Sequence, residues 1–162
     1  MKKTNNYHRA FGVYGICLEG NQLLVINKNG GPYINRFDLP GGSLEEGESL
    51  SEAMQREFLE ETGLEIKINE NIGVIDFKLP WQWKEFTDVH HIAVFYTVEK
   101  IGGKICEPEQ FVGQDSLGAV WVSEEDVNLG NASPLVLKAF EYLQTKDLGI
   151  DANIYEDWQV LK

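Results

Sequence analysis

The sequence predicts an α/β sandwich built as one domain. Several stretches rich in β-forming residues occur together with two stretches that carry helix boundary signals, a combination typical of strands packed against helices. The sequence contains no internal repeat, low-complexity segment or linker that would divide it. With 162 residues, 43% of them hydrophobic, the chain is long enough to bury a proper core. We therefore expect residues 1–162 to form a single domain.

The elements before the first helix are predicted from β-forming residues and turn signals. A polar lead-in covers residues 1–9, and a hairpin follows with strands over 10–18 and 22–27. A glycine-rich loop is predicted over 28–33 and a short strand over 36–40. The short strand runs into a turn at Gly41 and Gly42. Because glycine allows a positive φ and a close approach of the backbone to a ligand, this turn is a candidate for contact with a bound molecule.

Two helices are predicted from the signals at their ends. The first runs from about residue 49 to residue 62, where Gly63 stops it, and its apolar positions are Leu50, Ala53, Met54, Phe58 and Leu59. The second begins at Ser133, with Pro134 in its first position, and continues to about residue 146.

The remaining predicted elements are strands, a loop and a tail. The strands cover residues 64–79 with a break at 69–71, then 90–99 and 117–122, and the loop after the first of them covers 80–84. The tail that follows the second helix carries Tyr155 and Trp158. We expect these two aromatic side chains to dock on the body of the protein.

Three acidic residues share one face near the end of the first predicted helix. Glu57, Glu60 and Glu61 are related as i, i+3 and i+4, so their carboxylates are neighbours on the helix surface. Like charges at this spacing repel one another, and a carboxylate near a helix C-terminus also opposes the helix dipole. A cation over the cluster relieves both penalties. Because all the donors are oxygens, the sequence favours a hard divalent ion, Mg²⁺ or Mn²⁺, over zinc.

These glutamates belong to a longer pattern. The segment from Gly42 to Leu64 resembles the Nudix box, and every fixed polar and glycine position in it matches. It reads Gly42, five residues, Glu48, seven residues and then Arg56-Glu57-Phe58-Leu59-Glu60-Glu61-Thr62-Gly63-Leu64. The one departure is Phe58, which is aromatic where an aliphatic residue is usual, and we expect it still to pack inward. The resemblance implies the Nudix-type α/β/α sandwich, with a mixed sheet between helices and the box as a loop–helix–loop at one edge.

The resemblance also implies an enzyme. Nudix, or MutT-like, hydrolases are metal-dependent pyrophosphohydrolases that act on a nucleoside diphosphate linked to another moiety, often by attack of water on a phosphorus of the diphosphate bridge. The substrate would be a nucleoside triphosphate or a nucleotide sugar such as ADP-ribose. A second hypothesis is a catalytically silent Nudix-like module that binds nucleotides or regulates. The three retained, mutually repelling carboxylates argue against it.

Carried over residue by residue, the box implies a set of metal ligands, namely Glu57, Glu60, Glu61 and the carbonyl oxygen of Gly41 or Gly42. Arg56 and Glu48 resemble partners that orient the metal-binding carboxylates. The general base is left open between one of these glutamates and a more distant acid. Asp115 is the first candidate for a further acidic ligand outside the box, with Glu107 and Glu109 as rivals, because it precedes a predicted strand.

Candidates for binding the nucleotide are aromatic and basic, and they are Arg36, Phe37, Trp81 and Trp83. Phe86 is a further stacking candidate, and Lys28 is another basic residue near the glycine turn. Ordinary core packing explains the aromatic residues about as well, and a solvated surface charge explains Arg36 and Lys28. His90 and His91 point to opposite faces of their strand, so we expect one to be packed while the other could reach the cleft.

The composition of the chain limits the kinds of partner that the protein is expected to bind. The net charge of −12 provides no basic stripe, which argues against a nucleic-acid polymer but not against a small nucleotide substrate whose phosphates meet a divalent cation. No apolar run approaches the ~20 residues that span a bilayer, so we expect no membrane partner. Cys17 and Cys106 form neither a zinc motif nor a disulfide framework, which predicts a reducing compartment, the cytoplasm. We also expect no signal peptide. A monomer and a homodimer both remain open.

Overall fold

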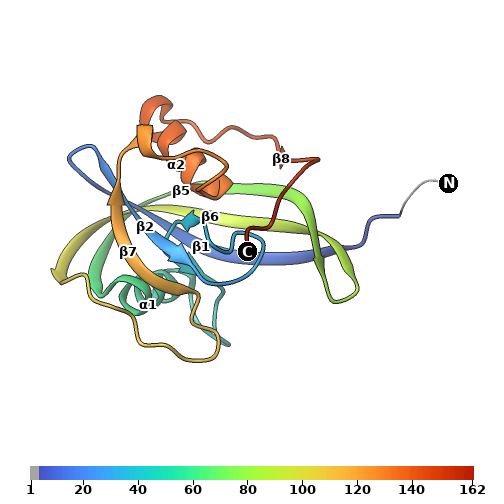
Figure 1. The fold of residues 1–162 in the computed structure, drawn as a ribbon. Coiled ribbons are helices and arrows are strands. Elements are labelled where there is room, and N and C mark those ends of the chain that lie inside the picture. The colour runs from blue at the N-terminus through green and yellow to red at the C-terminus, as the bar shows by residue number, and fades with distance from the viewer. Residues whose placement is uncertain (1–3) are drawn as a thin grey trace.

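The computed structural model describes residues 4–162, so the first three residues of the predicted lead-in lie outside it. Its strands are β1 (Tyr7–Glu19), β2 (Gln22–Lys28), β3 (Phe37–Asp38), β4 (Gly41–Gly42), β5 (Leu64–Trp83), β6 (Phe86–Gly103), β7 (Ser116–Val122) and β8 (Asn153–Ile154). Its helices are α1 (Leu50–Thr62), a short 3₁₀ turn (Glu124–Asp126) and α2 (Pro134–Thr145). Figure 1 shows how they are arranged.

One mixed sheet joins all the strands. The order along it is β3-β2-β1-β6-β5-β8, while β4 pairs with β1 and β7 pairs with β2. The central neighbours β1 and β6 are parallel over eleven pairs, from Tyr7↔Asp88 to Cys17↔Val98, and β5 and β8 are also parallel. The other pairs are antiparallel. The mixed sheet expected from the resemblance is therefore confirmed.

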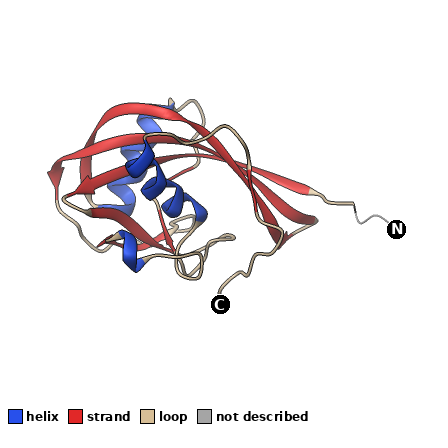
Figure 2. Cartoon of the chain, turned by 90° about the horizontal axis from the view of Figure 1, so that it is seen from above, coloured by secondary structure: helices blue, strands red, loops and turns tan. Residues whose placement is uncertain are grey.

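The two long helices cover opposite faces of this sheet (Figure 1). On one face, α2 contributes Leu135, Ala139 and Phe140 to the larger hydrophobic cluster. On the other face, α1 contributes Met54 and Phe58 to a separate cluster. Figure 2, turned by 90°, shows the β5–β6 hairpin continuing beyond the helices toward the N-terminus. The α/β/α sandwich is confirmed.

Helix α1 begins and ends where its sequence predicts. The Ser49 hydroxyl accepts a hydrogen bond from the Glu52 N–H at 3.1 Å, which caps the first turn. Gly63 ends the helix at φ 86°, a conformation that glycine adopts without steric cost. Phe58 is fully buried, as expected for this departure from the box. Leu59, expected on an apolar face, instead remains 50% exposed.

The predicted break and loop around strand β5 are wrong. β5 runs without interruption from Leu64 to Trp83, and shifts in register at Ile68/Glu70 and Asn71/Gly73 absorb the polar segment as irregularities in the pairing with β6. Pro80 lies beyond the short pairing with β8, at an edge of the sheet where a missing N–H is tolerated. The turn comes later, at Lys84, which has φ 53°.

The C-terminal tail docks on the body as expected. The Trp158 indole N–H donates to the Pro32 carbonyl at 2.9 Å, and the Tyr155 N–H donates to the Lys78 carbonyl at 2.9 Å. Both rings pack against the larger hydrophobic cluster. Across residues 4–162, neither helix is long and apolar enough to cross a bilayer.

Candidate active site

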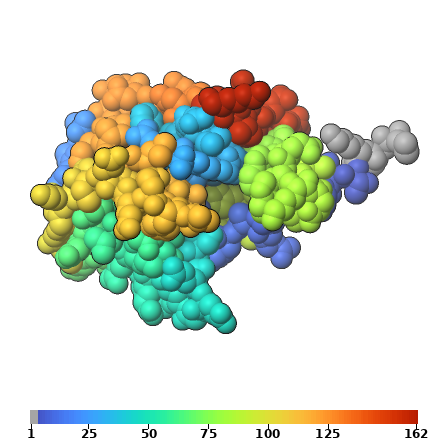
Figure 3. All heavy atoms as spheres, turned by 60° about the horizontal axis from the view of Figure 1, so that its bottom comes forward, coloured from blue at the N-terminus to red at the C-terminus, as the bar shows by residue number. Residues whose placement is uncertain are grey.

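Two hollows meet beside the glycine strand β4. We call the first, of about 250 Å³, the central pocket, and its walls include Tyr14, Lys28, Tyr33, Asp38, Trp81 and His91. We call the second, of about 260 Å³, the glutamate groove, and its walls include Arg56, Glu57, Glu60, Gly113 and Gln114. Ser43 and Asp115 line both hollows. In Figure 3, the central pocket lies between the blue segment near residue 30, the green hairpin and the gold segment near residue 115.

Strand β4 brings the glycine pair against both β1 and α1. Gly41 and Gly42 pair with Tyr14 and Val13 of β1. Gly41 has φ 150°, and a Cβ there would collide with the Val13 carbonyl oxygen, so only glycine lets the strands approach this closely. The Gly41 N–H donates to the Glu61 carboxylate at 2.7 Å. The turn predicted at these residues is therefore a short strand tied to the acidic helix.

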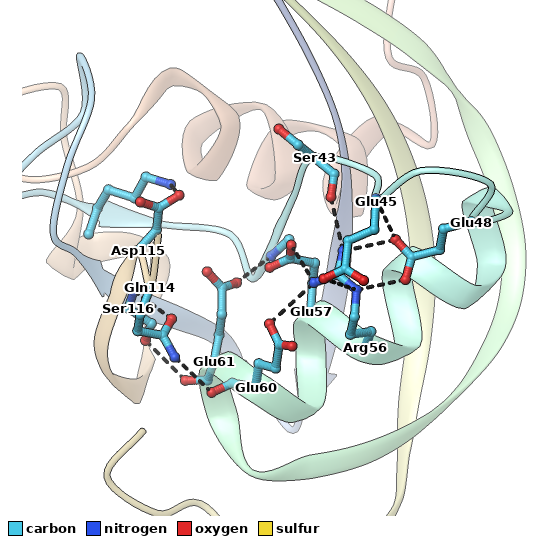
Figure 4. Close-up of polar contacts among 12 residues, drawn as sticks. Ser43, Glu45, Glu48, Arg56, Glu57, Glu60, Glu61, Gln114, Asp115 and Ser116 are labelled. Atoms are coloured by element: carbon cyan, nitrogen blue, oxygen red, sulfur yellow. Dashed lines mark hydrogen bonds and ion pairs between the residues drawn. The ribbon is translucent and has the colours of Figure 1, made fainter. Parts of the chain in front are cut away.

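Arg56 gathers the carboxylates of the box around its guanidinium (Figure 4). Its Nε and Nη2 bind the two carboxylate oxygens of Glu48 at 2.6 and 2.9 Å. Its Nη1 binds Glu57 at 3.0 Å and Glu60 at 3.2 Å, and Nη2 also donates to the Ser43 carbonyl. The hydrogen bonds from Arg56, with one from the Glu45 N–H, lower the pKa of Glu48 to about 2. Arg56 thus fixes Glu57 and Glu60 on α1 and joins them to Glu48 in the segment before the helix.

On α1, Glu61 is a buried acid and Glu57 a half-buried one. Glu61 is 1% exposed, and burial raises the pKa of its carboxyl well above the ordinary value, although Lys28 and the Gly41 N–H oppose the shift. Burial also raises the pKa of Glu57, against the opposing influence of Arg56. Two desolvated carboxyls beside each other are stabilised as anions by an added positive charge.

The donors fit a hard divalent cation by their chemistry. They are carboxylates and backbone carbonyls, the oxygen ligands that Mg²⁺ and Mn²⁺ take, and the desolvation of Glu61 and, in part, of Glu57 favours a neighbouring cation. Within residues 4–162, no three His, Cys, Asp or Glu side chains converge tightly enough to enclose a metal ion. Arg56 draws Glu57 and Glu60 to itself, while Gly41 holds Glu61.

Asp115 lies at the junction of the two hollows and forms an ion pair with Lys28. The Lys28 ammonium is 3.2 Å from the Asp115 carboxylate, and its side chain is only 12% exposed. Burial alone lowers the pKa of Lys28, but the carboxylates of Asp38, Asp115 and Glu61 outweigh it and hold the pKa above the usual value. The rival acids Glu107 and Glu109 are exposed and line neither hollow.

Of the predicted nucleotide-binding residues, Trp81 lines the central pocket and the other three do not. Trp83 stacks on Trp81 at a centroid distance of 5.2 Å, one position further out along the hairpin. Phe37 packs against the larger hydrophobic cluster. Arg36 is 4% exposed and donates to the Leu129 and Gln159 carbonyls, so its guanidinium serves the C-terminal tail instead of the pocket. Because its side chain is buried, the alternative prediction that Arg36 is a solvated surface charge is also wrong.

His91, and not His90, reaches the central pocket. Its Nε2 is 2.7 Å from the Tyr14 hydroxyl and its Nδ1 is 2.9 Å from the Tyr33 hydroxyl. Burial lowers the pKa of His91 to about 3, so the ring is neutral at physiological pH, with one nitrogen donating and the other accepting. His90 points the other way and contacts the Asp76 carboxylate at 2.7 Å.

Several residues of the site carry no sequence signal of their own. Tyr14 and Tyr33 look like ordinary core residues until the fold places both beside His91. Gln114 and Ser116 brace the end of α1 by donating to the Glu60 and Glu61 carbonyls.

Asp38 also lines the central pocket and was not singled out. One of its oxygens accepts from the Leu39 N–H and the Ser133 hydroxyl. The one available clue in the sequence is an acidic residue three positions before the glycine pair.

Comparison with known proteins places this arrangement in a family. The NUDIX domain model matches residues 6–144. An ADP-ribose pyrophosphatase of Methanocaldococcus jannaschii is 36% identical over 106 residues, which are 65% of this chain and 60% of that protein. A Bacillus subtilis protein described as a candidate 8-oxo-dGTP diphosphatase is 34% identical over 113 residues, 69% of this chain and 65% of that protein. The chain thus spans less than two thirds of either relative.

Solved structures agree on the fold. A NUDIX hydrolase from Nitrosomonas europaea superposes with a TM-score of 0.65 at 21% identity, over 86% of this chain and 90% of that one. At this identity the likeness speaks for the architecture alone. Because the family model covers most of the sequence, from the start of β1 to the end of α2, the chain belongs to the NUDIX domain family.

Proposed function

We propose that this protein is a divalent-metal-dependent pyrophosphohydrolase that acts on a nucleoside diphosphate linked to another moiety. The observation that carries the proposal is the pair of carboxyls of buried Glu61 and half-buried Glu57, on the helix beside the hollows that Lys28 and Asp115 line. Such acids are costly to keep desolvated unless a cation joins them. The named activities of the two relatives, on ADP-ribose and on 8-oxo-dGTP, fit the same class of substrate.

The roles of the residues follow from their surroundings. Glu57, Glu60 and Glu61, with a carbonyl of Gly41 or Gly42, would hold Mg²⁺ or Mn²⁺, and Asp115 would add a ligand from the opposite wall. When bound, the cation neutralises the charge of a diphosphate and so lowers the barrier to attack by water. Arg56 and Glu48 would keep the glutamates in position. The general base is one of these glutamates or Asp115.

The central pocket would take the nucleoside. Trp81 offers an aromatic face, and His91 with its two tyrosines offers polar groups that are fixed in place. The Lys28 ammonium lies between this pocket and the glutamates and would meet a phosphate oxygen. The free thiols of Cys17 and Cys106 suit a reducing compartment such as the cytoplasm.

The test is a nucleotide panel with purified protein in Mg²⁺ or Mn²⁺. The panel contains ADP-ribose, other nucleotide sugars, and dGTP with its 8-oxo form, and release of nucleotide, phosphate or pyrophosphate is followed. We expect turnover of at least one of these, abolished by a chelator and restored by added metal. Binding of a nucleotide with no turnover in either metal would favour the catalytically silent module instead.

A further inference from the structure

The C-terminal tail, residues 147–162, crosses the molecule to the loop between β2 and β3 (Figure 1). The family match ends at residue 144, so this segment lies outside the shared domain. We propose that the tail is a strap that fixes one wall of the central pocket, and that Trp158 is a positioning residue for substrate binding. The kinetic part of this inference rests on the proposed function, whereas the structural part does not.

Trp158 holds the pocket wall from outside. Its indole N–H donates to the Pro32 carbonyl at 2.9 Å, and its ring meets the Tyr33 ring edge-on at a centroid distance of 5.9 Å. Pro32 and Tyr33 both line the central pocket, whereas Trp158 does not. The tail therefore touches the back of the wall whose front lines the central pocket.

Arg36, which lies in the loop, makes a second set of contacts with the tail. Its guanidinium carbon lies 4.1 Å from the centroid of the Trp158 ring, and its Nη1 donates to the Gln159 carbonyl at 2.8 Å. Its Nε donates to the Leu129 carbonyl, which anchors the same side chain to the body. A cation over an indole face, desolvated at 4% exposure, is a favourable arrangement. The loop and the tail are thus joined by the contacts of Trp158 and by those of Arg36.

Further contacts connect Tyr33 to His91, another residue that lines the central pocket. Tyr33, held by Trp158, binds one ring nitrogen of His91, and Tyr14 binds the other. The wall contains Gly30 and Gly31, with Gly31 at φ 74°, and glycine loses more conformational freedom on ordering than any other residue. The loop's own backbone hydrogen bonds hold the wall together with the tail. Because ordering a flexible wall on binding costs affinity, a strap that orders it beforehand strengthens binding.

The strap acts on binding and not on chemistry. The glutamates lie on α1 and are held by Arg56 and Gly41, and none of their hydrogen bonds involves the tail. Loosening the wall lowers the fraction of molecules competent to bind, which raises KM while kcat stays the same. A general loss of folding would not produce this separation.

The experiment compares Trp158→Ala and Trp158→Phe with a matched tail variant, Asp157→Ala, whose side chain is exposed. Hydrogen–deuterium exchange is measured on the full chain without nucleotide, at the amides of residues 28–36, where the loop's own backbone hydrogen bonds lie. KM and kcat are measured in Mg²⁺ with ADP-ribose and with dGTP. Thermal unfolding of each variant is recorded alongside.

We expect Trp158→Ala to accelerate exchange in residues 28–36 and to raise KM roughly tenfold with kcat within about twofold, as for a wall that is ordered a tenth of the time. Trp158→Phe, which keeps an aromatic ring but loses the indole N–H, should lie between Trp158→Ala and the wild type, and Asp157→Ala should match the wild type. Wild-type exchange in Trp158→Ala overturns the strap. A fall in kcat at unchanged KM overturns its positioning role. If the wild type turns over no nucleotide but the exchange result holds, the proposed function fails while the strap stands.

Discussion

The Glu61 carboxylate accepts a hydrogen bond from the Gly41 N–H at 2.7 Å across 20 positions of sequence. This contact joins the end of α1 to strand β4, and it leaves the second carboxylate oxygen free of that bond. Burial raises the pKa of Glu61 most; Lys28 and the Gly41 N–H oppose the shift, while Glu57 and Asp38 add to it.

Replacing a glutamate of the box by its amide should remove activity. We expect Glu61→Gln and Glu60→Gln each to lower kcat by at least ~10²-fold, because the amide lacks the charge that would hold a cation against a diphosphate. Steady-state kinetics in Mg²⁺ with the substrate found in the panel measures this. Glu52→Gln, in the exposed first turn of α1, is the matched control and should match the wild type. Equal turnover in all four proteins would refute the assignment.

Arg56→Lys should weaken metal binding. Lysine keeps the charge but cannot bind both oxygens of Glu48 while also reaching Glu57 and Glu60. We expect affinity for Mn²⁺ to fall roughly 10–100-fold, the usual effect of losing a partner that orients metal ligands. Titration of free Mn²⁺ by electron paramagnetic resonance gives the affinity directly. Arg9→Lys, at an exposed arginine, serves as control, and an unchanged affinity in Arg56→Lys would contradict the role given to Arg56.

Gly41→Ala should destabilise the protein more than an alanine at another glycine of positive φ. At Gly41 the added methyl meets the Val13 carbonyl, whereas at Gly20, with φ 60°, it meets open space. Both variants carry a backbone penalty, which is larger at φ 150° than in the left-handed region at φ 60°, so their difference combines this excess with the collision. We expect Gly41→Ala to lose at least about 1–3 kcal/mol more in the free energy of unfolding, measured by denaturant titration. Equal losses would mean that β4 shifts without cost.

The stability of the protein should fall between pH 6.5 and pH 3 through His91. Burial lowers the folded-state pKa from 6.5 to about 3, so over this range the unfolded chain binds a proton that the folded one refuses. The contribution is complete above pH 6.5 and is lost as the pH falls, by up to about 1.4 kcal/mol per pH unit. His91→Gln removes the titrating group, so its unfolding free energy should depend less steeply on pH. Parallel profiles for the two proteins would exclude this.

The helices were predictable because their signals are local. Ser49 and Gly63 bound α1, and Ser133 with Pro134 begins α2, since each contact that caps a helix lies within a few residues. The spacing of Glu57, Glu60 and Glu61 likewise fixes their common side of α1 whatever surrounds it. Strand β5 was harder, because its pairing with β6 carries Pro80 and a polar segment that by themselves favour a turn.

The central pocket was not predictable in the same way. The aromatic ring alone makes Trp81 a candidate, and the same reasoning selects Phe37 and Trp83, which do not line the pocket. Arg36 shows the limit most clearly. Its charge suggested a phosphate, yet the partner that it finds is Trp158, more than a hundred residues away.

The sequence by itself determined the acidic helix, its boundaries and the chemistry of the ion that suits it, because those depend on spacing within one or two turns. The tertiary structure alone decided which residues line the central pocket. Tyr14 comes from β1, Tyr33 from the loop before β3 and His91 from β6, and they meet because β1 and β6 pair in parallel under that loop. Such contacts depend on the register of distant strands, which no local pattern specifies.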